Sequence, residues 1–253
     1  MHIVLVHGAG GTPTTWSEVL PLLTAAGRSA VAVTNPMRSL ATDVAHTAAA
    51  IDALDGPVLL VGHSYGGAVI TNAGNSPKVK GLVYVAAFAP DEGETVSGIV
   101  ERYPPAEVSK HMRRGPNGEW ASAHTDAYWA EIGWDLTPAQ RASWDAESRR
   151  AENAIFTEPT GIPAWRELPS WYLVAADDRT LRPEIQRDMA ARMGADTEEV
   201  PGSHFTPRVR PQAVVALIER ALVGARSEPR RPGPPRGGPV ASPAVATERR
   251  APR

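Results

Sequence analysis

The feature that most constrains this chain is the alternation of short apolar runs with longer segments of helical periodicity. Within most of the runs, consecutive residues are apolar and rich in valine and leucine. Strands of this kind are buried on both faces, as in a parallel sheet covered by helices. The pattern predicts an α/β fold, a doubly wound, mostly parallel sheet of about six strands. The predicted strands cover residues 3–7, 30–34, 57–62, 81–87, 170–176 and 196–202.

Helices are predicted between these strands. The segment 183–193 illustrates the signals, because it starts on Pro183 and is followed by Gly194, the usual asymmetry of helix ends. The predicted helices cover residues 14–26, 39–54, 64–74, 183–193 and 211–222.

Composition excludes several classes of function. The formal net charge of the 253-residue chain is −2, which favours neither a nucleic acid nor an acidic membrane surface as a partner. Cysteine is absent, which excludes disulfides, thiolate metal sites and a cysteine nucleophile. No run approaches the roughly 18 apolar residues of a membrane span, and the N-terminus lacks the features of a signal peptide. The sequence therefore predicts a cytoplasmic protein without a membrane partner.

Residues 88–168 interrupt the alternation of strands and helices. They hold five of the seven tryptophans and several helix-like patches, one of which opens on Thr137 and Pro138. We predict that residues 88–168 form a helical cap inserted after the fourth strand; the alternative is a surface elaboration that only adds stability. The predicted domain spans residues 1–224, cap included. Residues 225–253, with seven arginines and two glutamates among many prolines and glycines, are predicted to be a disordered tail.

The motif "GHSYG" at residues 62–66 places a serine between two glycines, at the join of a predicted strand and a predicted helix. This context is the one expected for a nucleophile elbow, a sharp turn that lifts a serine hydroxyl clear of the sheet. Such a turn strains the backbone and requires small residues on either side. We interpret Ser64 as the nucleophile; the alternative is a glycine-rich turn without chemistry.

A second glycine-rich loop, "HGAGG" at residues 7–11, follows the first predicted strand. A dinucleotide-binding loop would need a third glycine where Pro13 stands and an acidic residue after the second strand, and the sequence has neither. The alternative is an oxyanion loop, in which backbone N–H groups face the oxygen of a reacting carbonyl.

A serine nucleophile needs a base held by an acid, in the chain order serine, acid, histidine. His204 lies beyond the last predicted strand in a glycine- and serine-containing loop, and it is the candidate base. Asp177 and Asp178 both follow the strand at 170–176, and either could be the acid. No cluster of histidine and carboxylate residues has the spacing of metal ligands, so no metal is predicted.

The segments "VLVHGAGGTPTTW", "VGHSYGG", "WYLVAADDRTLRPEIQRDMA" and "VPGSHF" resemble the α/β-hydrolase superfamily, specifically the branch of plant-type methyl ester esterases and hydroxynitrile lyases with bacterial esterase-like relatives. The resemblance covers roughly residues 1–222. It implies Asp178 as the acid, because this residue has the family's spacing to Pro183 and Glu184. It also implies the backbone N–H groups of Ala9 and Tyr65 as the oxyanion hole.

The residue directly after the histidine is Phe205. The esterases of that branch have an apolar residue at this position, whereas the hydroxynitrile lyases have a lysine, so the chain resembles the esterases here. Together the motifs predict a carboxylesterase-like serine hydrolase that cleaves a small, largely apolar ester through an acyl-enzyme and uses no cofactor. Two alternatives stay open. The same triad could serve C–C bond hydrolysis, lactone hydrolysis or acyl transfer, or the fold could bind a small ligand without catalysis.

Overall fold

The computed structural model describes residues 1–116 and 119–226. Residues 227–253, almost all of the predicted tail, lie outside this description. Within the described residues, no helix is long and apolar enough to cross a membrane.

A single six-stranded sheet forms the centre of the molecule, with the strand order β2-β1-β3-β4-β7-β8. Every neighbouring pair in it is parallel, and Val4 for example lies opposite both Val31 and Leu60. The predicted fold class and strand number are confirmed. The strands are β1 (His2–Val6), β2 (Ala30–Val33), β3 (Val58–His63), β4 (Val79–Val85), β7 (Ser170–Ala175) and β8 (Asp196–Val200).

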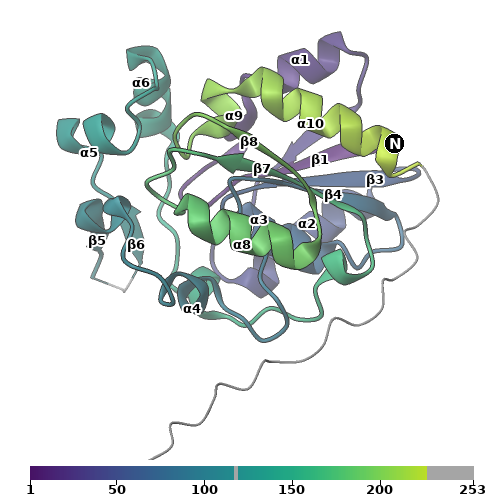
Figure 1. The fold of residues 1–253 in the computed structure, drawn as a ribbon, viewed down its shortest axis with the longest axis horizontal. Helices are drawn as coiled ribbons and strands as arrows, with labels where there is room; N and C mark the ends of the chain where they lie inside the picture. Colours follow the sequence, from purple (N-terminus) through teal and green to yellow (C-terminus); the bar gives the residue numbers. More distant parts are fainter. Residues whose placement is uncertain (117–118, 227–253) are drawn as a thin grey trace, which may run out of the picture.

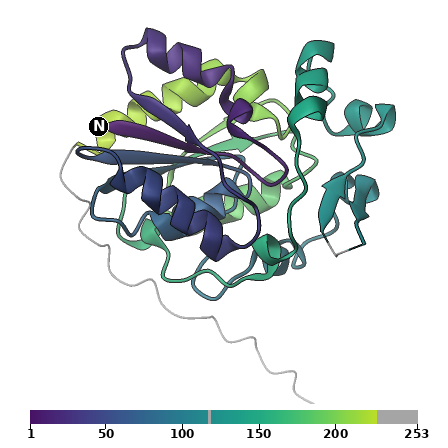
Figure 2. The same ribbon diagram turned by 180° about the vertical axis from the view of Figure 1, so that it is seen from behind.

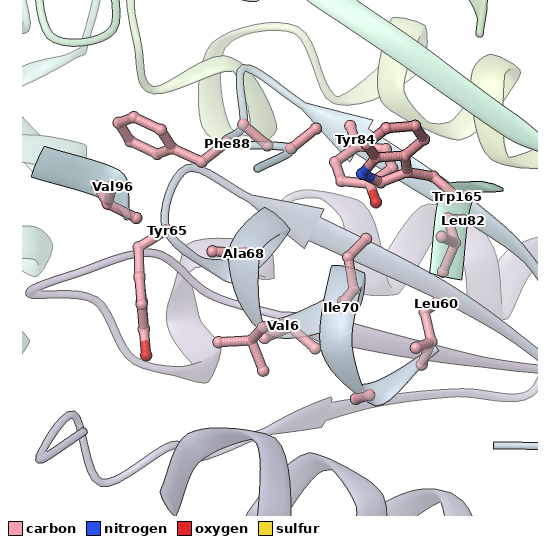
Figure 3. Packing of buried hydrophobic residues seen from close by; sticks show 14 of the residues in the cluster. Val6, Leu60, Tyr65, Ala68, Ile70, Leu82, Tyr84, Phe88, Val96 and Trp165 are labelled. Carbon is pink, nitrogen blue, oxygen red and sulfur yellow. The ribbon is translucent and has the colours of Figure 1, made fainter. Parts of the chain in front are cut away.

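Helices cover both faces of the sheet (Figure 1). On one face Leu60 packs with residues of α2 (Leu40–Asp52), α3 (Gly66–Ala73) and α8 (Pro183–Met193). Figure 3 shows Leu60 in this cluster, beside Ile70 and Leu82. On the other face Leu59 and Val61 pack with residues of α1 (Val19–Ala25) and α10 (Pro211–Gly224). Strand β3 is thus apolar at consecutive positions because neighbouring side chains enter two different cores.

The predicted helices differ from the observed ones mainly near the N-terminus. The single helix expected at residues 14–26 is divided into a 3-10 helix η1 (Pro13–Trp16) and α1, which begins at Val19. A short helix α9 (Thr206–Val209) after His204 was not predicted.

The segment between β4 and β7 contains the residues predicted as a helical cap. Its elements between Met112 and Glu147 lie beside one end of the sheet in both views (Figures 1 and 2). In addition to helices it contains an antiparallel pair of strands, which the sequence did not predict. Its elements are α4 (Val96–Val100), η2 (Glu107–His111), β5 (Met112–Arg114), β6 (Trp120–Ser122), α5 (Asp126–Glu131), α6 (Pro138–Glu147), α7 (Ala154–Thr157) and η3 (Ala164–Arg166).

Shortening a core side chain on β3 tests this packing. Leu60 is fully buried, so Leu60→Ala should leave a cavity and lower the free energy of unfolding by about 2–5 kcal/mol. Urea denaturation of both proteins measures the difference. The control is Val31→Ala on the edge strand β2, where 41% exposure predicts a change of only about 0.5 kcal/mol. Equal losses in the two variants would contradict the assigned core.

Candidate active site

Ser64 occupies a strained turn between β3 and α3. Its φ angle of 54° lies in the left-handed region, which residues with a side chain rarely adopt. The turn is held by its carbonyl oxygen, which accepts hydrogen bonds of 3.0 Å from the N–H groups of Gly67 and Phe88. The candidate nucleophile therefore has the strained backbone expected of an elbow.

Glycines around Ser64 are required by close approaches of the backbone. A Cβ atom at Gly62 would lie 2.6 Å from the carbonyl oxygen of Gly66, and one at Gly66 would overlap the carbonyl oxygen of Val6. In the neighbouring loop, a Cβ at Gly8 would lie 2.6 Å from the Cβ of Ser64. The two glycine-rich motifs of the sequence thus pack against each other at one point.

His204 and Asp178 form a buried pair next to this turn. Nδ1 of His204 donates to Oδ2 of Asp178 over 2.6 Å, and the side chain of Asp178 is fully buried. Oδ2 also accepts from the side chain of Gln186, while Oδ1 accepts from the backbone N–H groups of Thr180 and Leu181. These four hydrogen bonds hold the side chain of Asp178 in place beside the imidazole of His204.

The neighbouring Asp177 has a different partner. This exposed side chain accepts a hydrogen bond of 3.0 Å from the N–H of Gly202, in the loop that leads to His204. The structure therefore brings Asp178, and not Asp177, into contact with the candidate base.

His63 supports the loop that carries His204. Its Nε2–H donates to the carbonyl oxygen of His204 over 2.8 Å, and the two rings lie 4.8 Å apart. Complete burial holds the pKa of His63 well below its usual value, so the ring is neutral. The residue before the candidate nucleophile thus positions the candidate base.

The loop that contains Ala9 is held by another buried histidine. Nδ1–H of His7 donates to the carbonyl oxygen of Gly8, and Nε2 accepts from the N–H of Asn35. Burial lowers the pKa of His7 to about 4, which keeps the ring neutral. Within the described part of the chain, the N–H groups of Ala9 and Tyr65 donate to no carbonyl or side chain. Both residues line the cavity that contains Ser64, so their N–H groups remain the candidates for an oxyanion hole.

A buried carboxylate that the sequence did not identify connects the two loops. Asp43 accepts hydrogen bonds of 2.9 Å from the hydroxyl of Tyr65 and from the N–H of Met37. The sulfur of Met37 in turn accepts from the N–H of Gly10 over 3.2 Å. His7 belongs to the glycine-rich motif at residues 7–11, whereas Asp43 lies in no motif of the sequence, and only the fold reveals its connection to the site.

A cavity of about 930 Å³ contains the candidate residues Ser64 and His204. Its wall is largely apolar, and most of it comes from residues 88–168, the predicted cap. Within the described residues, no group of three or more histidine, aspartate and glutamate side chains could hold a metal ion. Apolar cavity residues outside the elbow include Phe88, Val96, Val100, Tyr103, Val108, Met112, Tyr128, Trp144, Phe156, Ile185 and Phe205.

The sequence profile of the Alpha/beta hydrolase family matches residues 3–217, and the chain belongs to this family. It is similar to Methylesterase 8 of Arabidopsis thaliana, with 25% identity over 215 residues that cover 74% of this chain and 76% of that protein. A 60-residue segment, 23% of this chain, is 43% identical to a carbendazim hydrolyzing esterase of Nocardioides sp. (strain SG-4G), of which it covers 25%. The predicted resemblance to methyl ester esterases is thereby confirmed.

Solved structures show the same fold. A pyrethroid hydrolase from Sphingobium faniae JZ-2 superposes with a TM-score of 0.75 at 21% identity, over 90% of this chain and 98% of that one. The fold and the relatives establish an α/β hydrolase with esterase-type relatives.

The neutral state of His7 predicts a pH dependence of stability. In the unfolded chain this histidine binds a proton below pH 6.5, whereas the folded protein resists protonation down to about pH 4. Stability is therefore lost as the pH falls through this window, by about 2 kcal/mol at pH 5 for His7 alone. In His7→Asn the loss between pH 7 and pH 5, measured by urea denaturation, should be smaller by that amount. The control is His46→Asn at an exposed position of α2; equal losses in both variants would contradict the assignment.

Proposed function

We propose that this protein is a serine carboxylic-ester hydrolase in which Ser64 is the nucleophile, His204 the base and Asp178 the orienting acid. The observation that carries the proposal is the 2.6 Å hydrogen bond between His204 and Asp178, in a loop that His63 ties to the strained turn of Ser64. The esterase-type relatives support it.

In the first half of the reaction, Oγ of Ser64 attacks the ester carbonyl carbon while Nε2 of His204 accepts the hydroxyl proton. Asp178 accepts the hydrogen bond from Nδ1–H of His204 and stabilises the imidazolium that forms. The carbonyl oxygen gains negative charge, which the N–H groups of Ala9 and Tyr65 bind; each such donor contributes on the order of 3 kcal/mol. His204 then protonates the leaving alcohol, and Ser64 carries the acyl group.

In the second half, water replaces the alcohol. His204 accepts a proton from the water as its oxygen attacks the acyl carbonyl, and the same N–H groups bind the oxyanion. Collapse of this intermediate returns the proton to Ser64 and releases the carboxylic acid. Every proton is exchanged through His204, so no cofactor enters the cycle.

The cavity wall supports a small, largely apolar ester as the substrate. Phe205, next to the candidate base, is 3% exposed and packs against Trp129 and Trp144. Cyanohydrin cleavage would be expected to need a lysine at this position. The apolar ring of Phe205 there favours ester hydrolysis.

A fluorophosphonate probe tests the nucleophile. The wild-type protein should be labelled with a stoichiometry near one and should hydrolyse short p-nitrophenyl esters, because the probe reacts only with an activated serine. Ser64→Ala should lose the labelling and about 10⁶-fold of kcat. Circular dichroism of both proteins controls for folding. Folded wild-type protein that is not labelled, or a Ser64→Ala variant that still is, would contradict the proposal and favour a ligand-binding role.

The two adjacent aspartates provide a matched pair for the acid. Asp178→Asn should lower kcat by about 10⁴-fold, because an amide next to Nδ1 favours the wrong tautomer of His204. Asp177→Asn keeps an acceptor for the N–H of Gly202 and should change kcat by less than about threefold. Steady-state kinetics on one ester measures both. A large loss in Asp177→Asn alone would show that the acid is assigned to the wrong residue.

A further inference from the structure

Besides His63 and His204, the largely apolar wall of the cavity contains a third histidine, His124, that the proposed reaction does not use. It lies in the cap, between β6 and α5, and its side chain is only 16% exposed. The centroid of its ring lies 4.8 Å from that of Tyr128 and 5.2 Å from that of Trp129. Two aromatic side chains thus fix the orientation of this imidazole.

Asp145 of α6 lies next to one of the two ring nitrogens of His124. Its Oδ1 lies 2.8 Å from Nδ1 of His124. A carboxylate can only accept, so this contact favours a proton on Nδ1 and a lone pair on Nε2. Burial lowers the pKa of His124 against the opposing effect of Asp145, which favours the neutral ring. Within the described residues, Nε2 has no hydrogen-bond partner.

The pair His124–Asp145 is separated from the candidate base by aromatic rings. The centroid of Phe205 lies 6.5 Å from that of His204 and 5.8 Å from that of Trp129, which contacts His124. His124 therefore lines the cavity from the cap, and ring contacts through Trp129 and Phe205 connect it to His204. An acceptor at this position suits the far end of a substrate whose ester carbonyl is at Ser64.

We propose that Nε2 of His124 binds a hydrogen-bond donor, a hydroxyl or an N–H group, at the end of the substrate remote from the ester. The inference rests on the proposed esterase function and narrows its substrate class. The apolar wall accommodates the body of the ester, and His124 selects esters that carry a donor over those that carry only an acceptor or a hydrocarbon. Asp145 is a positioning residue that maintains the tautomer.

A set of aryl esters tests the preference. Methyl 3-(hydroxyphenyl)propanoates, with the hydroxyl in the meta or para position, are compared with their methoxy analogues, which lack the donor. At least one hydroxyl ester should have a kcat/KM at least about fivefold higher than its methoxy analogue, because a buried acceptor left without a partner is costly. Methyl 3-phenylpropanoate gives the reference rate for the apolar body.

The variant His124→Phe keeps a ring for Tyr128 and Trp129 to pack against but removes the acceptor. The ratio between hydroxyl and methoxy esters should fall to about one, since only the hydroxyl ester used the lost lone pair. The matched control is His111→Phe. His111 is also paired with a carboxylate, Glu131 at 2.8 Å, and its ring also contacts Tyr128 at 5.6 Å, but it lies outside the cavity lining among the described residues. This control should retain the wild-type ratio.

The outcomes separate the two proposals. If wild-type protein hydrolyses none of the esters and resists the fluorophosphonate probe, the proposed function fails. If it hydrolyses all of them with a ratio near one, or if His124→Phe retains the preference, the role of His124 fails while the esterase function stands. Should His124→Phe not fold, Asp145→Leu provides the second test: loss of the tautomer should reduce the wild-type ratio, and an unchanged ratio would overturn the proposal.

Discussion

Three strained backbone positions underlie the organisation of this site. Met37, Ser64 and Ala86 are the non-glycine residues with positive φ in the described part of the chain, and each follows a strand of the sheet, β2, β3 and β4 respectively. Such a conformation costs on the order of 1–3 kcal/mol and persists only where the surroundings enforce it. The positive φ of Ser64 is maintained by the hydrogen bonds that its own carbonyl oxygen accepts and by close packing of the backbone around it. The strain is what brings its hydroxyl to the cavity.

Three buried histidines near this turn differ in the partners they have. His7 and His63 donate to backbone carbonyls, which do not compensate a positive charge fully, and burial keeps both neutral. His204 donates to Asp178, whose negative charge can stabilise an imidazolium. All three side chains are almost fully buried. Their hydrogen-bond partners therefore distinguish His7 and His63, which support the backbone, from His204, the candidate base.

Much of the fold could be predicted because it depends on local sequence. Consecutive apolar residues indicated the buried strands, and glycines indicated the positions where backbones meet around Ser64. The resemblance to the α/β-hydrolase branch, through its spacing from the acid to Pro183, implied the aspartate that contacts His204. The β5–β6 pair could not be predicted, because "MRR" and "WAS" have no alternating pattern. Asp43 was missed for another reason: its partners lie 6 and 22 residues away, and only the packing of α2 brings them together.

Residues 149–152, within the predicted cap, contact the loops that contain Gly10, Asn35 and Met37. The N–H of Arg149 donates to the carbonyl oxygen of Gly10, and its guanidinium donates to that of Asn35. The N–H of Glu152 donates to the carbonyl oxygen of Met37, whose sulfur binds the N–H of Gly10. These contacts join the segment to the loop that contains Ala9. A segment that holds the Ala9 loop and also lines the cavity can change turnover and substrate preference together, because both depend on the same stretch of backbone.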